Sequence, residues 1–220
     1  MNGYDFSLAG VDLTALGSGA LWWREADLLC VSDLHLGKSE RIARRGGTTL
    51  PPYETRDTLN RLSDDLEKTD AKTVICLGDN FDDLHAAEAL TEHDRTSITV
   101  LQSGRQWLWI EGNHDPGPVE FGGAHLAEYS RDGLTFRHIA QSGAQAEISG
   151  HYHPKATLRS RGRAISRAAF LVDDARVILP AYGTYTGGLR CDDAALCALM
   201  GPRSVAILTG PTPAPMPMPR

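Results

Sequence analysis

Polar side chains follow four apolar segments of the chain, each at the point where the segment ends. They are Asp33 and His35 in SDLH, Asp79 and Asp82 in GDNFDD, Asn113, His114 and Asp115 in GNHD, and His151 and His153 in SGHYHP. A polar group at the end of a buried strand costs stability unless it has a partner. Carboxylate and imidazole together suit borderline divalent ions such as Mn, Fe or Zn. The four clusters therefore indicate a metal site.

Each cluster also has an ordinary structural interpretation when it is taken alone. A D-x-H or G-D after a strand often forms a cap or turn, GNHD can close a turn, and H-x-H can be two surface imidazoles. In a strand, however, residues two positions apart point the same way, so Asp33 and His35 would offer two ligands together, as would His151 and His153. The occurrence of all four clusters in order, each after an apolar strand, favours metal binding.

The elements that must position these residues alternate in type over the first half of the chain. Apolar segments predict strands over 27–35, 71–79 and 106–115, and helical patterns cover 54–69 and, more weakly, 86–103. In the first helix Leu59, Leu62 and Leu66 share one face, and Thr55 is the expected N-cap. The basic segment before it is expected to be a loop. This order predicts an α/β sheet whose functional groups gather beyond the carboxyl ends of its strands.

From about residue 124 the pattern changes to short strand-like segments without a convincing long helix between them. This half is expected to be largely antiparallel, and the economical arrangement is two sheets packed face to face with helices outside. The Pro-rich residues 210–220 are expected to be a disordered tail, because proline cannot donate to a strand ladder. Residues 1–209 are expected to form a single domain.

Composition narrows the class of protein further. With 220 residues, 41% hydrophobic and 23% charged, the chain has the composition of a soluble globular protein, and its apolar runs are too short to span a membrane. The amino terminus lacks the features of a secretory signal, so a cytoplasmic protein is expected. Cys30, Cys76, Cys191 and Cys197 lack CxxC spacing and are expected to be small buried hydrophobes. The net charge of -6 argues against nonspecific coating of nucleic acid.

The blocks DLH, GDNFD, GNHD, a lone His138 and GHYH, which span Asp33 to His153, resemble in their order the signature of the calcineurin-like metallophosphoesterases. The resemblance implies a four-layer αββα sandwich of two mixed sheets with a dinuclear metal centre. VSDLHLGKSERIARRGG, LPPYETRDTL and LPAYGTYTGGL are similar to the ligase-associated DNA damage response branch of that family. The similarity covers the chain to about residue 200. It implies a role in DNA repair beside DNA ligase, helicase and exonuclease partners.

The resemblance also implies which residues hold the two metal ions, with Mn expected first and Fe or Zn as alternatives. One ion would be held by Asp33, His35, Asp79 and His153. The other would be held by Asp79, Asn113, His138 and His151, so that Asp79 bridges the two. His138 is preferred to the nearby His125 because it ends the strand-like run LTFRH. Asp82 is expected to orient His114, with Asp83 or His85 as substitutes.

The chemistry of such a centre needs no protein nucleophile. Two divalent ions can acidify a bridging water to hydroxide and bind phosphoryl oxygens for in-line attack. His114 follows the ligand Asn113 without being assigned to a metal, so it is suited to protonate the departing oxygen. His114 and Asp82 are therefore the expected catalytic residues.

The substrate is less constrained than the reaction. Basic residues follow the first and last metal blocks, at Lys38, Arg41, Arg44 and Arg45 and at Arg159, Arg161, Arg163 and Arg167. They form either one groove that guides a polyanion, with Lys38, Arg41 and Arg45 binding substrate, or two solvated faces. The leading hypothesis is a phosphodiesterase, such as an endonuclease, that acts on nucleic acid. The alternatives are a phosphomonoesterase or small-nucleotide hydrolase, and a metal-stabilised interaction module of a repair complex.

Overall fold

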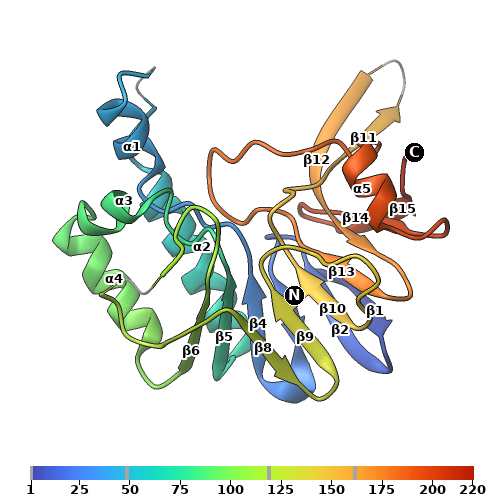
Figure 1. The fold of residues 1–220 in the computed structure, drawn as a ribbon, viewed down its shortest axis with the longest axis horizontal. Helices are drawn as coiled ribbons and strands as arrows, with labels where there is room; N and C mark the ends of the chain where they lie inside the picture. The colour runs from blue at the N-terminus through green and yellow to red at the C-terminus, as the bar shows by residue number, and fades with distance from the viewer. Residues whose placement is uncertain (1, 48–49, 118–119, 161–162) are drawn as a thin grey trace.

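The first of two mixed sheets is built mainly by the amino-terminal half of the chain. The computed structural model describes residues 2–47, 50–117, 120–160 and 163–220. The strands of this seven-stranded sheet lie in chain order (Figure 1): β1 (Gly3–Leu8), β2 (Val11–Leu16), β3 (Leu21–Trp23), β4 (Leu28–Val31), β5 (Thr73–Leu77), β6 (Gln106–Ile110) and β7 (Ala124–Leu126). Pairing is antiparallel from β1 to β4 and parallel from β4 to β7. The predicted parallel α/β order is thus present at its centre.

The second sheet comes from the carboxyl-terminal half. Its order is β15-β14-β12-β13-β10-β9-β8, and β11 pairs with β12 beyond this path. The bounds are β8 (Glu128–Arg131), β9 (Leu134–Arg137), β10 (Glu147–Ser149), β11 (Lys155–Ser160), β12 (Arg163–Val172), β13 (Arg176–Ile178), β14 (Val205–Leu208) and β15 (Ala214–Pro217). Only β10 pairs in parallel with its neighbours among the strands described in this sheet. The largely antiparallel half expected from the sequence is confirmed.

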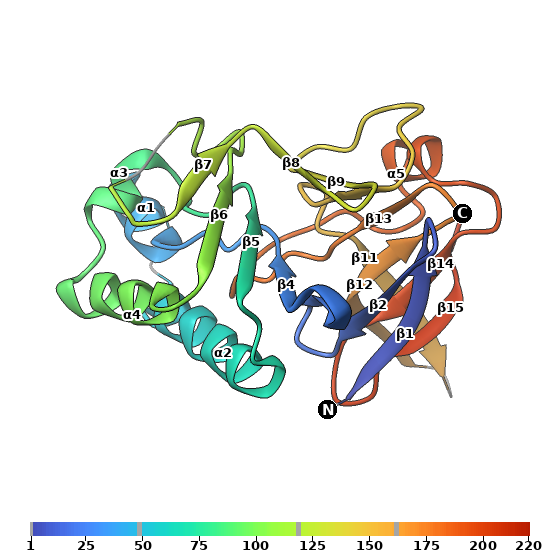
Figure 2. The same cartoon turned by 90° about the horizontal axis from the view of Figure 1, so that it is seen from below.

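Helices cover both outer faces, which completes the predicted four layers. α1 (Lys38–Arg44), α2 (Glu54–Thr69), α3 (Leu84–Glu88) and α4 (Glu92–Gln102) lie on the side of the first sheet, and α5 (Ala194–Leu199) lies on the second. Figure 2 shows α2 and α4 beside each other. No helix in the described ranges is long and apolar enough to cross a membrane.

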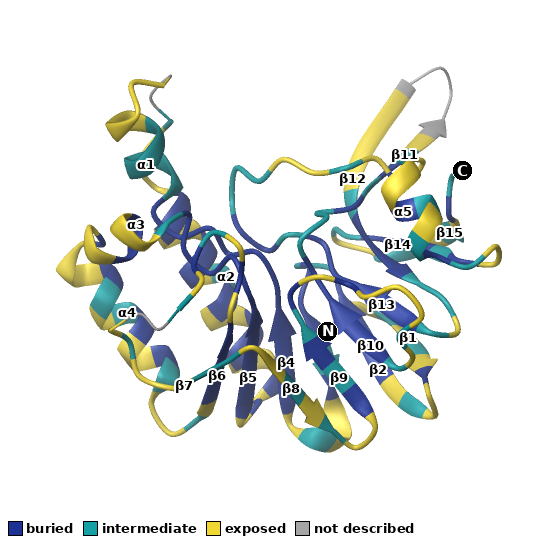
Figure 3. Cartoon of the chain, viewed as in Figure 1, coloured by how far each residue is buried: buried dark blue, intermediate teal, exposed yellow. Residues whose placement is uncertain are grey.

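The core follows the period-two alternation of the strands. In β4, Leu28 and Cys30 face the second sheet, where they pack in a cluster with Phe136 and Phe170. Leu29 and Val31 face the helices instead. Because successive strand residues point to opposite faces, a strand buried on both sides is apolar throughout. Figure 3 shows the central strands, among them β4, β5, β10 and β13, as buried, whereas outer strands such as β1 and β8 carry exposed residues.

Helix α2 holds the outer layer through the predicted apolar face. Leu59, Leu62 and Leu66 are at most 4% exposed, and the helix ends where Asp70 adopts a left-handed φ of 50°. The expected cap is wrong, since the helix already begins at Glu54 after Tyr53. The Thr55 hydroxyl instead accepts a hydrogen bond from the Gly37 amide at 2.9 Å, so it ties α2 to the start of α1.

Three expectations about elements need correction. The basic segment predicted as a loop forms α1, whose Arg41 and Arg44 pair with Asp82 and Asp83 of the loop after β5. The helix predicted over 86–103 is two helices, because the Thr91 side chain caps a new start by accepting from the Asp94 amide. The segment at 124–126 joins the edge of the first sheet rather than the second, and the chain crosses between sheets just after it.

The carboxyl-terminal tail is the fourth correction, since Ala214–Pro217 form the edge strand β15 on β14. Prolines occupy positions 215 and 217, and the amide of Met218 donates to the Ser204 carbonyl at 2.9 Å. Alternation therefore places both prolines with their nitrogen toward the free edge, where no ladder donor is needed. Met218 is 6% exposed in the cluster beneath α5. The proline spacing that suggested disorder is the spacing an edge strand tolerates.

Candidate metal centre

The candidate ligands lie just beyond the carboxyl ends of strands from both sheets. Asp33 and His35 follow β4, Asp79 follows β5, and Asn113 follows β6. From the second sheet, His138 follows β9, and His151 and His153 follow β10. Parallel pairing of β4, β5 and β6 puts their ends at one edge of the first sheet. The site is thus assembled where the two sheets meet.

The backbone at these positions is left-handed rather than extended. Positive φ angles between 46° and 71° occur at five of the seven candidate ligands, namely Asp33, His35, Asp79, His151 and His153. Such conformations are uncommon for residues other than glycine and persist only where the surroundings hold them. Asp33 and His35 therefore converge through a turn, and the strand alternation used to pair them in the sequence is not the cause.

Two glycines of the motifs allow the loops to approach closely. A Cβ on Gly112 would overlap the backbone and carboxylate of Asp79, and one on Gly150 would overlap the Ser32 hydroxyl. The glycines that precede Asn113 and His151 thus serve packing. The G-N and G-H pairs of the sequence reflect this crowding between loops.

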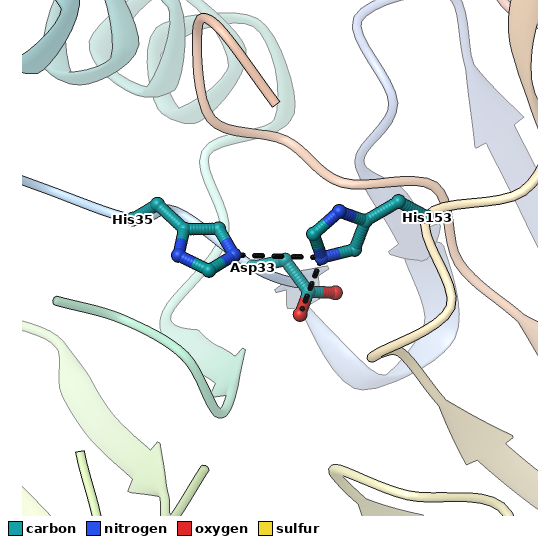
Figure 4. Close-up of side chains that lie close together, drawn as sticks. All are labelled: Asp33, His35 and His153. Carbon is teal, nitrogen blue, oxygen red and sulfur yellow. Dashed lines mark hydrogen bonds and ion pairs between the residues drawn. The ribbon is translucent and has the colours of Figure 1, made fainter. Parts of the chain in front are cut away.

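Asp33, His35 and His153 form the first group of possible ligands (Figure 4). His153 Nε2 lies 3.1 Å from Asp33 Oδ1 and 3.4 Å from His35 Nε2. Asp33 is fully buried, and its other oxygen accepts from the Ser32 hydroxyl at 2.5 Å and the His151 amide at 2.9 Å. One carboxylate oxygen and two imidazole nitrogens therefore face a common point.

Asp79, His138 and His151 form the second group. His138 Nε2 lies 3.2 Å from His151 Nδ1 and 3.4 Å from Asp79 Oδ1, and Asn113 Oδ1 lies 3.1 Å from the same nitrogen. The Nδ1 atom of His138 pairs with the Leu77 carbonyl at 2.8 Å, so it is the donor there and Nε2 is left to bind. His138, rather than His125, reaches the cluster, since His125 lies on β7 against Trp109.

Asp79 lies between the two groups. Its Oδ1 faces His138, while its Oδ2 lies 4.0 Å from His35 Nε2 and 3.9 Å from His114 Nε2. The amide of His114 also donates to Oδ1 at 2.9 Å. A single carboxylate with one oxygen toward each group has the position that a bridging ligand requires.

The donor set fits divalent metal ions. Asp33 Oδ1 is buried and makes no hydrogen bond with the described residues, although buried polar atoms normally have a partner. Carboxylate oxygens, an amide oxygen and imidazole nitrogens that converge without a paired thiolate suit a borderline or hard cation. The structure therefore brings together the residues implied by the motifs as a candidate ligand set.

The charges of the site keep both central acids ionised. Burial acts to raise the pKa of Asp33, but His153, whose Nε2 lies 3.1 Å from Oδ1, outweighs this effect and lowers the pKa below its ordinary value. Burial is likewise outweighed at Asp79, where His138 lowers the pKa. In return Asp79 and Asp33 raise the pKa of His138 against the effect of its burial. Ionised carboxylates are the form in which these groups bind cations.

His114 occupies the open side of the cluster. Its side chain is 31% exposed, and its Nδ1 pairs with the main-chain carbonyl of Asp82 at 2.8 Å. The prediction that the Asp82 carboxylate orients His114 is wrong, because that carboxylate faces His35 Nδ1 at 2.9 Å. In the loop after β5, the main-chain carbonyl of Asp82 therefore contacts His114, and its carboxylate contacts His35.

The proposed substitutes for Asp82 have other partners. Asp83 caps α3 by accepting from the Ala86 amide and pairs with Arg44 at 2.8 Å. The His85 side chain is 76% exposed and faces Glu88.

Asp115 is a structural residue that the sequence left unexplained. It is 3% exposed and accepts hydrogen bonds from the amides of Gly112, Asn80 and Phe81. Burial raises its pKa to about 6 despite these donors. It therefore joins the turn after β6 to the loop after β5, which carry Asn113 and Asp79.

The predicted substrate-binding cations differ in their surroundings. Lys38 and Arg41 contact the buried Asp82 at 3.4 and 2.8 Å, whereas the Arg45 side chain is 62% exposed. In the second basic run Arg167 is exposed on β12, Arg161 lies outside the described residues, and Arg159 and Arg163 belong to the strands of the β11–β12 ribbon. In Figure 1 α1 and this ribbon both project from the upper edge of the molecule, α1 at its left end and the ribbon at its right end.

Comparison with known proteins agrees with this site. The model of the calcineurin-like phosphoesterase family matches residues 26–179, a range that contains every candidate ligand. A similar solved structure is the nuclease MPE of Pseudomonas putida, with a TM-score of 0.76 and 26% sequence identity. That match covers 98% of this chain and 100% of the nuclease chain. No curated protein matches the chain.

Proposed function

Because the chain belongs to the calcineurin-like phosphoesterase family, we propose that it is a dinuclear, metal-dependent phosphodiesterase that cleaves nucleic acid. The observation that carries this proposal is the position of Asp79 between two groups of converging ligands. One metal ion would be held by Asp33, His35, Asp79 and His153. The second would be held by Asp79, Asn113, His138 and His151.

Two such ions, with Mn proposed first and Fe or Zn as alternatives, supply an activated water and bind the phosphoryl oxygens. The chain itself supplies the fixed arrangement of ligands and a proton donor. His114 is that donor in our proposal, because its Nε2 is directed to the cluster while part of its ring remains exposed. Its Nδ1 pairs with the Asp82 carbonyl, which orients the ring toward a departing oxygen.

The choice of a diester in nucleic acid rests on the similar solved structure, which is that of a nuclease. Arg45 supports this choice as an exposed cation beside the metal loops, suited to a backbone phosphate. The sequence motifs shared with the ligase-associated branch support a role in DNA repair beside a ligase, a helicase and an exonuclease. Localisation in the cytoplasm is part of the same proposal.

Hydrolysis of bis-p-nitrophenyl phosphate with Mn tests the reaction class. We expect the wild type to cleave this diester and Asp79→Ala to lose the activity, since Asp79 serves both groups of ligands. Retained activity in Asp79→Ala would refute the dinuclear proposal.

A panel of single-stranded DNA, duplex DNA, RNA and p-nitrophenyl phosphate under the same conditions tests the substrate class. Faster hydrolysis of the monoester than of every diester would favour the phosphomonoesterase alternative.

A further inference from the structure

We infer that Arg41 is a positioning residue of the metal centre, which holds the ligand His35 in place through the buried carboxylate of Asp82. The inference rests on the proposed function only in that a divalent ion binds at His35. It differs from the substrate contact that the sequence suggested for Arg41, because the guanidinium is directed to an internal carboxylate.

Asp82 is the centre of this arrangement. Its side chain is fully buried, and its two oxygens have different partners. Oδ1 lies 2.9 Å from His35 Nδ1 and 3.4 Å from Lys38 Nζ, and Oδ2 lies 2.8 Å from Arg41 Nη1. A buried carboxylate needs charge and hydrogen-bond partners on both oxygens. Arg41 supplies the shortest contact that Oδ2 makes among the described residues.

His35 links this carboxylate to the ligand cluster. Its Nδ1 faces Asp82, and its Nε2 lies 3.4 Å from His153 Nε2 and 4.0 Å from Asp79 Oδ2. A carboxylate oxygen 2.9 Å from Nδ1 favours the tautomer that carries its proton on Nδ1 and leaves Nε2 free for a metal, and this contact restricts the ring. The order of contacts is therefore Arg41, Asp82, His35 and the metal position.

Arg41 is better placed than Lys38 for this role. Its Nε lies 3.5 Å from Asp83 Oδ2, so one guanidinium faces two consecutive carboxylates of the loop that follows Asp79. Planar guanidinium groups bind in such a fork, whereas an ammonium is a single point of charge. Arg41 thereby also fixes the loop that presents Asp82.

Helix α1 has anchors that do not involve Arg41. The Gly37 amide donates to Thr55, and the amide and hydroxyl of Ser39 donate to Glu54 at 3.0 and 2.8 Å. Arg44 pairs with Asp83 at 2.8 Å. Replacement of Arg41 is therefore expected to leave the helix in place and to disturb mainly the Asp82 carboxylate.

Calorimetric titration of the metal-free protein with Mn²⁺, without substrate, tests the inference. We expect Arg41→Gln to lower the affinity for one of the two Mn²⁺ ions by about 10-fold or more. This is the size of effect seen when a group that orients a metal ligand is lost. Arg203→Gln is the control for a lost guanidinium, since the Arg203 side chain is 87% exposed and pairs with the exposed Asp174. It should bind both ions as the wild type does.

A double substitution separates action through Asp82 from a general effect. If Arg41 acts through this carboxylate, Arg41→Gln should cause little further loss of metal affinity in an Asp82→Asn background. If circular dichroism shows that Arg41→Gln does not fold, Arg41→Lys replaces it. This variant should lower the affinity for one Mn²⁺ ion at least threefold.

Wild-type Mn²⁺ affinity in Arg41→Gln, or in Arg41→Lys when it stands in, would overturn the inference. A raised KM with unchanged metal affinity would assign Arg41 to the substrate instead. The proposed function fails separately, if the wild type binds two ions and hydrolyses no diester.

Discussion

His114 is the residue whose loss should separate catalysis from metal binding. We expect His114→Ala to lower kcat for bis-p-nitrophenyl phosphate by about 10²- to 10⁴-fold, the usual contribution of a positioned general acid. Metal content should remain near that of the wild type, because the contact that residue 114 makes with Asp79 through its amide survives the substitution. Steady-state kinetics and elemental analysis measure the two quantities.

His85→Ala provides the control for a lost imidazole, since His85 is exposed on α3. Loss of both activity and metal in His114→Ala would make His114 a ligand instead of an acid.

Asp115 belongs to the same motif but should affect stability rather than the reaction itself. Asp115→Ala leaves three amides, those of Gly112, Asn80 and Phe81, without their buried acceptor. We expect the free energy of unfolding to fall by about 3 kcal/mol, since each unpaired buried group costs roughly 1 to 3 kcal/mol and part of the loss is relieved by relaxation. Urea denaturation measures it.

Asp174→Ala is the corresponding surface substitution, because Asp174 and Arg203 form an exposed pair. A loss of similar size in both variants would show that the Asp115 hydrogen bonds are not the cause.

At the scale of elements, β15 shows that alternating prolines are compatible with an edge strand. Met216→Pro would remove a donor that faces β14, whereas Pro215→Ala changes a residue whose nitrogen faces the free edge. We expect Met216→Pro to lower the free energy of unfolding by about 1 to 3 kcal/mol, through the lost ladder hydrogen bond and its partner carbonyl. Pro215→Ala should stay within about 0.5 kcal/mol of the wild type.

Thermal or urea unfolding of the two variants distinguishes the strand from a loose tail. Equal stability of Met216→Pro and the wild type would be incompatible with β15 as a paired strand.

At the scale of the whole molecule, the candidate metal centre draws residues from both sheets. The candidate ligands Asp33, His35, Asp79 and Asn113 follow strands of the first sheet, and the other three candidates follow strands of the second. A ligand that binds only the folded state stabilises it by about 2.7 kcal/mol when the free ligand concentration is 100 times its Kd. For a chain of this length that corresponds to a rise in Tm of roughly 5 to 10 °C.

We therefore expect Mn²⁺ to raise the Tm of metal-free protein by this amount in scanning calorimetry. His151→Ala, which removes a ligand from the second sheet, should reduce the rise. Calorimetric binding of Mn²⁺ without any change in Tm would contradict a site built from folded loops of both sheets.

Much of the fold could be predicted from the sequence because its signals are local. β4, β5 and β6 are short apolar segments that end in glycine or polar residues, and α2 has leucines at helical spacing. Each candidate ligand follows such a segment, so its type and order in the chain were readable. The two-sheet arrangement followed from the change of pattern near residue 124.

The contacts between distant segments could not be read in this way. Asp82 faces His35 and Arg41 because α1 packs over the loop after β5, and nothing in the spacing of these residues encodes that packing. The left-handed turns at Asp33 and His35, and the ordering of the proline-containing edge by β14, also depend on neighbours far along the chain.

The sequence by itself therefore determined which atoms are available for chemistry, because side-chain type and position relative to a strand are local properties. Only the tertiary structure decided which of those atoms face one another, since the contact of Asp82 with His35 and the approach of His138 to Asp79 and His151 arise from packing between sheets and helices.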